Sequence, residues 1–324
     1  MNKLSSQKKA FLSGDLTKWE YFEKIYSIHD YLWDYSEFIK DTNVSKIEIE
    51  DDSVVFTCRN SQIKFACARG ENRSLPLAIL NLGDYETEEL NMQLQLIKDG
   101  DTVFDIGGNI GWYALHVAKA RPLSTVHTFE PVPWTFEWME KNLQINGLRN
   151  IISHNLGFSD KAGDLDFFFD PTISGNASLT NVADKENIQV LKGKVSTLDG
   201  YVEKENAKID FIKCDVEGAE LFVFKGGMNV LKKHKPIIFT EMLRKWSAKF
   251  NYHPNQIIEL FRQLDYAPYV ILGETAISKH KLNSPPPPIV KLCKFDLVDE
   301  NTIETNYFFL HKEKHADIIK QFAI

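Results

Sequence analysis

The chain has 324 residues, which at roughly 150 residues per domain allows about two domains, or one large domain with an extension. Apolar residues make up 43% of the chain and charged residues 26%, a balance that excludes a largely disordered or fibrous protein. The net charge of −7 disfavours dedicated binding to nucleic acid or to an anionic membrane surface.

The amino-terminal segment has no uninterrupted apolar run and no small-residue cleavage site, which argues against a secretory signal. No stretch approaches about 18 consecutive apolar residues, so we expect no integral membrane segment. The cysteines at positions 58, 67, 214 and 293 form no C-x-x-C pair, which favours reduced cysteines over a zinc site or a disulfide framework. These features together predict a cytoplasmic protein.

The first ninety residues differ in texture from the rest. Residues 16–40 carry aromatic side chains at helical spacing, and the alternating runs KIEIE, SVVFT and QIKFACA that follow predict a small antiparallel meander. We expect the aromatic side chains to form core or a docking surface rather than a cofactor box. A lid or an oligomer contact is a further alternative, which leaves a homo-oligomer open. We assign residues 1–83 to an N-terminal helical and β-meander extension.

From residue 84 onward, helical and strand patterns alternate. Helices are expected at 87–98, 111–120, 135–146, 219–233 and 254–264, and strands at 102–106, 125–130, 151–158, 165–169, 209–215, 236–242, 267–272 and 305–312. Strands separated by helices of this length imply βαβ units and a largely parallel sheet with helices on both faces. Residues 84–324 therefore predict a doubly wound α/β domain.

A glycine-rich loop joins the strand at 102–106 to the helix that follows it. The loop reads Asp105-Ile-Gly107-Gly-Asn109-Ile-Gly111, and glycines here allow a ligand to approach the backbone closely. Glu130 ends the next strand, and an acid about twenty residues after such a loop accepts hydrogen bonds from a ribose diol. The pair predicts an adenosine-type cofactor at the carboxyl edge of the sheet.

The loop also separates the candidate cofactors. Its spacing is D-x-G-x-N-x-G rather than G-x-G-x-x-G, so a dinucleotide would lack the expected third glycine. The carboxylate of Asp105 would repel a phosphate and attract a sulfonium that carries an ammonium group. This favours S-adenosylmethionine over NAD. An NAD-dependent oxidoreductase and a non-catalytic partner protein that keeps the fold remain the competing hypotheses.

Nine segments between residues 83 and 242 share a common pattern: GDYETEEL, DTVFDIGGNIGWYAL, FEPVP, KNLQING, GFSDKAG, GNASL, VSTLDGYV, IDFIKCDVEGAE and PIIFTEM. In these segments the chain resembles the FkbM-type family of S-adenosylmethionine-dependent methyltransferases, and the D-V-E-G-A-E block is the most specific piece. Gly108 stands where that family usually has alanine, and Cys214 where it often has isoleucine or leucine.

The resemblance implies a class I methyltransferase fold, Rossmann-like, with a mostly parallel seven-stranded sheet. It also implies the residues that bind S-adenosylmethionine. The loop residues Asp105, Gly107, Asn109 and Gly111 would hold its methionine end and Glu130 its ribose. The segment from Asn155 to Gly157 would border its adenine, with Phe158 packing nearby.

Further carboxylates follow two other strands, where the crevice of an open α/β sheet binds substrate. An alcohol acceptor must lose its proton during the reaction. Either a positioned base takes the proton, or a metal ion lowers the pKa of the hydroxyl. We hypothesise that Asp215 or Glu217 is the base and that Glu241 orients the acceptor; in the variant hypothesis, Asp215 and Glu241 bind Mg²⁺. Lys213 is a candidate partner for one of these acids, and Glu220 an acid that begins the next helix.

The resemblance to this family also implies the class of acceptor: a hydroxyl on a sugar, a glycan or a glycosylated natural product, which the enzyme would O-methylate. Asn176 and Ser178, in the GNASL segment, are candidate hydrogen-bonding partners of such a substrate. His253 lies in a loop that could reach the acceptor site. The expected partner is therefore a small-molecule or glycan acceptor, and no nucleic acid.

Overall fold

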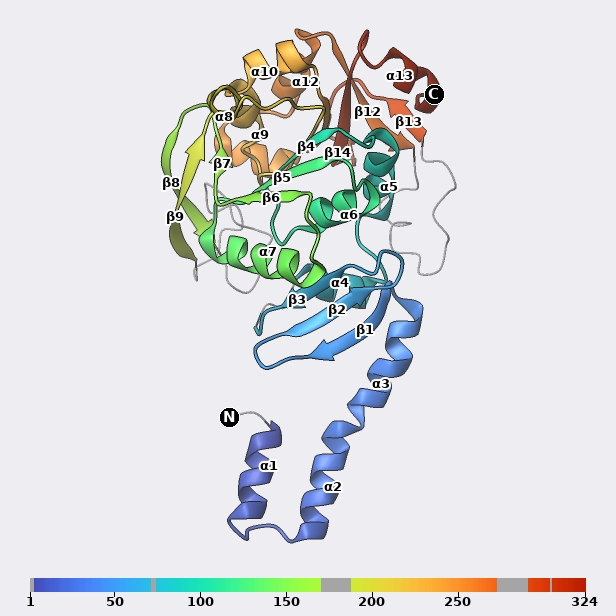
Figure 1. The fold of residues 1–324 in the computed structure, drawn as a ribbon, viewed down its shortest axis with the longest axis vertical. Helices are drawn as coiled ribbons and strands as arrows, with labels where there is room; N and C mark the ends of the chain where they lie inside the picture. Colours follow the sequence, from blue (N-terminus) through green and yellow to red (C-terminus); the bar gives the residue numbers. More distant parts are fainter. Residues whose placement is uncertain (1–2, 71–73, 170–187, 273–290, 304) are drawn as a thin grey trace.

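An eight-stranded sheet lies at the centre of the computed structural model, which describes residues 3–70, 74–169, 188–272, 291–303 and 305–324 (Figure 1). The strand order is β13-β12-β14-β11-β10-β4-β5-β6. The strands are β4 (Thr102–Ile106), β5 (Thr125–Phe129), β6 (Ile151–His154), β10 (Phe211–Cys214), β11 (Ile237–Glu241), β12 (Tyr266–Leu272), β13 (Lys291–Lys294) and β14 (Asn306–His311).

Most of this sheet is parallel. The five strands from β6 to β11 all run in one direction, and β14 is antiparallel to both β11 and β12. The seven strands from β6 to β12 form the mostly parallel sheet that the sequence predicts. The eighth strand, β13, adds to its edge by pairing antiparallel with β12.

Helices cover both faces of the sheet, and each face has its own hydrophobic core. Alternate residues of β4 show the division, because Val103 belongs to the cluster under α5 and α6 and Phe104 to the cluster under α8, α9 and α12. The prediction of a doubly wound α/β domain is confirmed. The helices are α5 (Thr87–Leu96), α6 (Trp112–Ala120), α7 (Pro133–Asn146), α8 (Leu198–Glu205), α9 (Glu220–Lys225), α10 (Met228–His234), α11 (Arg244–Ser247), η3 (Ala248–Phe250), α12 (Asn255–Arg262) and α13 (Ala316–Phe322).

Two predicted elements are each divided in the structure. The strand expected at 151–158 is two strands, since β7 (Gly157–Phe158) leaves the main sheet to join β9 (Gln189–Ser196) and β8 (Gly163–Phe169). The helix expected at 219–233 is two helices, α9 and α10. A Cβ atom on Gly226, between them, would lie 2.2 Å from the carbonyl oxygen of Ser159, so the chain turns where it touches this backbone.

The N-terminal region contains a small antiparallel sheet that is joined to the main body. The sheet is the meander of β1 (Val44–Ile49), β2 (Val54–Cys58) and β3 (Lys64–Cys67). The helices of the region are α1 (Lys3–Leu12), α2 (Lys18–His29), α3 (Tyr31–Phe38), η1 (Ile39–Asp41) and α4 (Leu75–Leu82). The side chains of Asn142 and Asn146 on α7 accept hydrogen bonds from the backbone amides of Ala66 and Lys64, at 2.8 and 2.9 Å. These side chains satisfy backbone N–H groups of the edge strand β3 that no neighbouring strand in the described part of the chain pairs with, and they fix the meander to α7.

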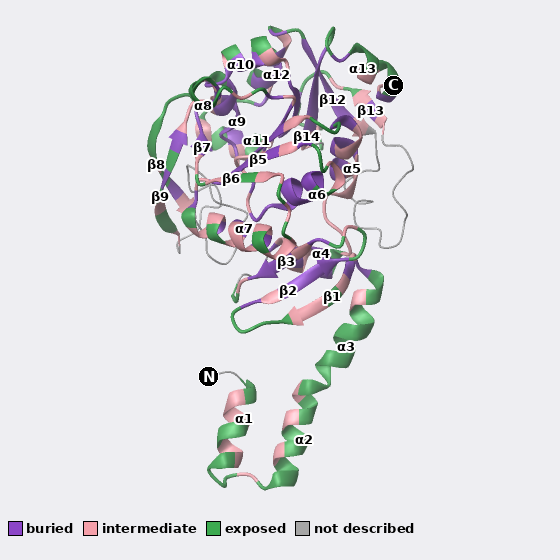
Figure 2. Cartoon of the chain, viewed as in Figure 1, coloured by how far each residue is buried: buried purple, intermediate pink, exposed green. Residues whose placement is uncertain are grey.

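The aromatic helices of this region do not form core. No residue of α1, α2 or α3 is buried (Figure 2), so of the two expected roles for these aromatics only an exposed surface is compatible with the structure. Cys58, Cys67 and Cys214 are buried thiols, and Cys293 is half-buried. Among the described residues, no helix has the length and apolar character needed to cross a membrane.

Candidate active site

The glycine loop turns from β4 into α6 in a conformation that requires small residues. Gly107, Asn109 and Gly111 have φ angles of 75°, 48° and 92°, in the left-handed region. The amide of Gly107 donates to the Phe129 carbonyl at 3.0 Å, and a Cβ atom on Gly107 would lie 1.8 Å from the carbonyl oxygen of Asp215. The loop is therefore held tightly between β5 and β10.

Asp105, at the end of β4, is buried and paired with a cation. Its Oδ2 accepts a hydrogen bond from the Thr128 hydroxyl at 3.1 Å, and its Oδ1 lies 3.5 Å from Nζ of Lys213. Lys213 is buried as well, donates to the Gly107 carbonyl at 2.7 Å and lies 3.6 Å from Asp215. Lys213 thus pairs with two acids at this edge, as the sequence suggests for one of them.

Glu130 follows β5 and faces the same loop. Its Oε2 accepts from the Asn109 amide at 3.1 Å and its Oε1 from the Val132 amide at 3.0 Å. Burial raises the pKa of Glu130 to about 7, against the opposing effect of these two amides. Each carboxylate oxygen has two lone pairs, so both oxygens can accept a further donor from a ligand.

The residues expected at the adenine lie beside Glu130. Asn155 donates from Nδ2 to the Glu130 carbonyl at 2.8 Å. Gly157 packs closely on Pro131, whose Cβ would lie 3.1 Å from a Cβ on this glycine. Phe158 is buried, and its ring meets that of Phe129 edge to face at 4.8 Å. The structure brings this segment next to Glu130; its contact with adenine stays a prediction.

The ends of β10 and β11 carry a second group of carboxylates. Asp215, Glu217 and Glu241 are each partly exposed. Burial raises the pKa of Glu217 and of Glu241 well above the usual range, and the negative charge of Asp215 raises both further. Carboxyl groups with raised pKa values bind a proton more tightly than an ordinary glutamate does.

Glu220 has a structural role in shaping this group. Its Oε1 accepts hydrogen bonds from the amides of Val216 and Gly218, at 3.1 and 3.0 Å, and its Oε2 accepts from the hydroxyl of Tyr252 at 3.2 Å. It begins α9, as expected from the sequence. Glu220 therefore fixes the turn that presents Glu217.

One acid of this edge, Glu86, is missing from the sequence-based predictions. The hydroxyl of Tyr113, on α6, donates to Oε2 of Glu86 at 2.5 Å, and the Tyr113 ring centroid lies 5.6 Å from Nζ of Lys213. Burial raises the pKa of Glu86 to about 7. In the sequence, Glu86 belongs to the GDYETEEL segment, which matches the family pattern. Only the fold brings the Glu86 side chain to Tyr113.

The residues expected at the acceptor have mixed outcomes. Asn176 and Ser178 lie outside the described residues. His253 is exposed, and its Nδ1 accepts from the Asn255 amide at 3.2 Å, at the start of α12. In the part of the chain that the structure describes, no group of three or more His, Cys, Asp or Glu side chains could hold a metal ion, which gives the magnesium hypothesis for Asp215 and Glu241 no support.

Two buried oxygens beside the loop point to a ligand that donates hydrogen bonds. Within the described residues, Oδ1 of Asn109 accepts no hydrogen bond, and Oδ1 of Asp105 has only the ammonium of Lys213 beside it, at 3.5 Å. Buried acceptors are normally satisfied, so a donor-bearing group is expected there. An ammonium group beside an adenosine has the chemistry that these acceptors and Glu130 require, and S-adenosylmethionine therefore fits the site.

The sheet order and the site at its carboxyl edge define a class I methyltransferase fold, a Rossmann-like doubly wound α/β domain. The model of the methyltransferase FkbM domain matches residues 105–268, half of the chain. The chain belongs to the FkbM methyltransferase family.

Several curated proteins are similar to the chain. The 31-O-demethyl-FK506 methyltransferase FkbM of Streptomyces tacrolimicus is 33% identical, over 40% of this chain and 60% of the relative. The hexuronic acid methyltransferase AglP of Haloferax volcanii is 29% identical, over 45% of this chain and 58% of the relative. Methyltransferase 1 of Beauveria bassiana is 29% identical, over 40% and 59% respectively. The chain spans about three fifths of the length of these relatives.

Among solved structures, the chain is similar to a methyltransferase FkbM from Methylobacillus flagellatus. The TM-score is 0.41 at 14% identity, with 74% of this chain and 56% of that chain covered.

Proposed function

We propose that this protein is an S-adenosylmethionine-dependent methyltransferase that methylates a hydroxyl oxygen. The observation that carries the proposal is the buried Oδ1 of Asn109, which accepts no hydrogen bond within the described residues, beside the carboxyl groups of Asp105 and Glu130. An amide oxygen and two carboxyl groups suit a cationic nucleoside and would be poor neighbours for a pyrophosphate. Membership of the FkbM methyltransferase family supports the same choice over the oxidoreductase alternative.

Each residue at this edge has a distinct part in binding the cofactor. Asp105 and Asn109 accept from the ammonium group, and Glu130 accepts from the ribose hydroxyls. Gly107 and Gly111 give the loop its left-handed turns. Asn155 and its neighbours border the adenine. When bound, S-adenosylmethionine supplies a methyl group on a positively charged sulfur.

The second carboxylate group serves the acceptor. Methyl transfer requires an acceptor oxygen held roughly 3–3.5 Å from the methyl carbon and in line with its bond to sulfur. Asp215 or Glu217 takes the hydroxyl proton, and Glu241 orients the acceptor. The raised pKa values of Glu217 and Glu241 mean that this group binds a proton more tightly than an ordinary glutamate does. Lys213 holds Asp215 in position through their ion pair at 3.6 Å.

The acceptor we propose is a hydroxyl of a sugar, a glycan or a natural product. Support comes from two relatives, one named for a hexuronic acid and one for 31-O-demethyl-FK506. We propose that the reaction takes place in the cytoplasm, whose reducing conditions suit the buried thiol of Cys58.

The test is transfer of an isotopically labelled methyl group. The full chain is incubated with labelled S-adenosylmethionine and a panel of hydroxyl acceptors that includes uronic acids and sugar nucleotides, and products are identified by mass spectrometry. We expect a labelled O-methyl product, and its loss in Asp215→Asn or Glu217→Gln with cofactor binding retained. Glu205→Gln, at an exposed position on α8, is the control.

The competing hypotheses predict other results. Binding of NAD without binding of S-adenosylhomocysteine would favour the oxidoreductase. Binding of neither would favour a non-catalytic protein. Wild-type turnover in Asp215→Asn and in Glu217→Gln would exclude both as the base.

A further inference from the structure

The helical arm, which we define as residues 3–38, carries large hydrophobic side chains that the described part of the chain leaves uncovered. Trp19, Tyr26 and Trp33 are 79%, 62% and 69% exposed. In Figure 2 the arm is coloured as exposed or intermediate along its whole length. Its aromatic side chains exposed by about half or more are Trp19, Phe22, Tyr26, Tyr31, Trp33, Tyr35 and Phe38.

The area that these side chains offer is that of an interface. An aromatic side chain buries 150–250 Å² when fully covered. Covering the exposed parts of the arm's aromatics would therefore bury about 700–1,000 Å². A standard protein–protein interface buries about 800 Å² per partner, and the largest patch on a typical monomer is only about 300–600 Å². The arm alone supplies one side of a stable interface.

The end of the arm is a formed helical hairpin. Thr17 and Glu20 make a capping box at the start of α2, and the rings of Phe11 on α1 and Tyr21 on α2 stack at 4.8 Å. Figure 1 shows this hairpin extending away from the meander, so its own sheet does not cover it. Local sequence thus builds a rigid projection that presents apolar side chains to another surface.

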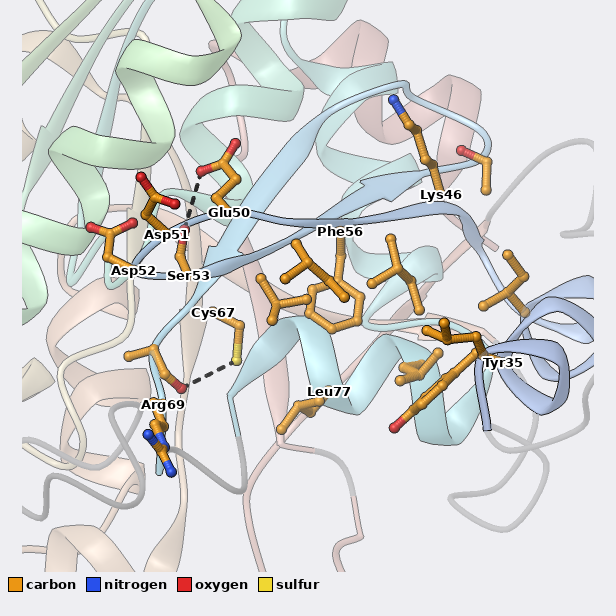
Figure 3. A pocket seen from close by; sticks show the side chains of 18 of the residues that line it. Tyr35, Lys46, Glu50, Asp51, Asp52, Ser53, Phe56, Cys67, Arg69 and Leu77 are labelled. Atoms are coloured by element: carbon orange, nitrogen blue, oxygen red, sulfur yellow. Dashed lines mark hydrogen bonds between the residues drawn. The ribbon is translucent and has the colours of Figure 1, made fainter. Parts of the chain in front are cut away.

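A groove of about 870 Å³ lies between the base of the arm and the meander (Figure 3), and we call it the arm groove. Apolar side chains of several elements line it, among them Leu32 and Tyr35 of α3, Phe56 of β2, and Leu77 of α4. The loop between β1 and β2 closes one end with acidic residues 50–52. A hydrophobic groove of this kind accepts the apolar face of a helix.

The charge of α1 is opposite to that of the acidic end of the arm groove, whose lining elsewhere includes Lys46 and Arg69. Helix α1 contains three lysines, at positions 3, 8 and 9, and no acidic residue. At the end of the groove, Asp52 is paired with Lys141 at 2.8 Å, whereas Glu50 and Asp51 make no ion pair within the described residues. Complementary charges of this kind fix the register of an association.

We propose that two copies of this chain form a two-fold dimer by exchanging arms. The α1–α2 hairpin of each copy lies in the arm groove of the other, with its aromatic side chains against the apolar walls and its lysines beside Glu50 and Asp51. A two-fold arrangement uses the same hairpin and the same groove twice and closes on itself.

Sedimentation velocity over a concentration series of the full chain is the first test. We expect a dimer, and at least a tenfold rise in its dissociation constant in the double variant Trp19→Asp, Tyr26→Asp. Leu123→Asp is the matched control, because Leu123 is 76% exposed but lies outside the arm. A wild-type monomer at every concentration, or a dimer that the arm variant leaves unchanged, would overturn the proposal.

A charge exchange tests the groove itself. Lys8→Glu with Lys9→Glu should weaken the dimer several-fold, and adding Glu50→Lys with Asp51→Lys in the same chain should restore it. Circular dichroism establishes that each variant is folded. Failure of the second pair to restore a weakened dimer would contradict the assigned contact, as would an unaffected dimer after the first.

Cross-linking shows which copy each arm contacts. An equal mixture of unlabelled and ¹⁵N-labelled chains is treated with a zero-length carbodiimide reagent. We expect mixed-isotope cross-links between the lysines of α1 and Glu50 or Asp51. Cross-links only within one isotope would overturn the exchange, and so would a monomer that binds phosphatidylserine vesicles through Trp19 and Tyr26.

Discussion

The ammonium group of Lys213 lies 3.5 Å from a carboxylate oxygen of Asp105, and both side chains are almost fully buried where β4 and β10 pair. Lys213→Met would leave this carboxylate buried without its cation, which typically costs about 3–5 kcal/mol. We expect urea unfolding to show a loss of that size. Lys208→Met is the control, because its ion pair with Asp210 involves an exposed ammonium and should contribute under about 1 kcal/mol. Equal, small losses in both variants would contradict a structural role for Lys213.

Gly108 makes room for Thr128. A Cβ atom at this glycine would lie 2.0 Å from the Thr128 hydroxyl oxygen, which donates to Asp105. Gly108→Ala should therefore destabilise the chain by about 1–3 kcal/mol through overpacking. Adding Thr128→Ala should recover part of this loss, measured by thermal unfolding. An additive effect of the two substitutions would mean that they do not share this contact.

Stability should fall as pH rises through neutrality. The pKa values of Glu86, Glu130 and Glu220 are raised to about 7 by burial, whereas an unfolded glutamate titrates near 4.5. Between these values the folded chain binds protons that the unfolded chain has lost, so the free energy of unfolding decreases with pH. The stabilisation is complete below about pH 4.5 and is lost through about pH 7.

Urea unfolding at pH values from about 5 to 8 measures this slope, which is on the order of 1 kcal/mol per pH unit for each group that binds an extra proton. Glu130→Gln removes one titrating group and should flatten the curve. A stability that rises over this range in the wild-type chain would contradict the assigned pKa directions.

Methyl transfer should persist after exhaustive treatment with EDTA. The account uses a carboxylate base from the group formed by Asp215, Glu217 and Glu241, with Lys213 as the cation beside Asp215. Loss of turnover on EDTA treatment, and its return when Mg²⁺ is added, would instead support the hypothesis that Asp215 and Glu241 bind the metal. The rate of labelled product formation is the measurement.

Much of the fold could be predicted because its signals are local. The strand TVFDI is β4 at the same residues, and the helix after the glycine loop differs from α6 by one residue. Elements that depend on tertiary contacts were divided or missed. The chain turns at Gly226 because the backbone of this glycine packs closely against the backbone of Ser159. Strand β9 forms because it pairs with β7 and β8. No single-sequence pattern contains these contacts.

The candidate site likewise contains features that the local sequence predicts and features that depend on tertiary contacts. The carboxylates at strand ends could be predicted from position, and the structure brings Asp105, Glu130 and Asp215 to one edge of the sheet. The partners that tune them could not, because Thr128, Tyr113 and Glu86 reach this edge from separate elements. The sequence marks the arm by its aromatic residues at helical spacing. That these side chains are exposed follows only from the path of the chain.

Calorimetry with S-adenosylhomocysteine tests the central claim most directly, because it asks whether the edge of β4 and β5 binds the nucleoside. We expect saturable one-to-one binding to the wild-type chain, at least tenfold weaker in Glu130→Ala, while Glu205→Ala on the surface of α8 binds as the wild type does. A folded wild-type chain that takes up no heat of binding at millimolar ligand would contradict the account.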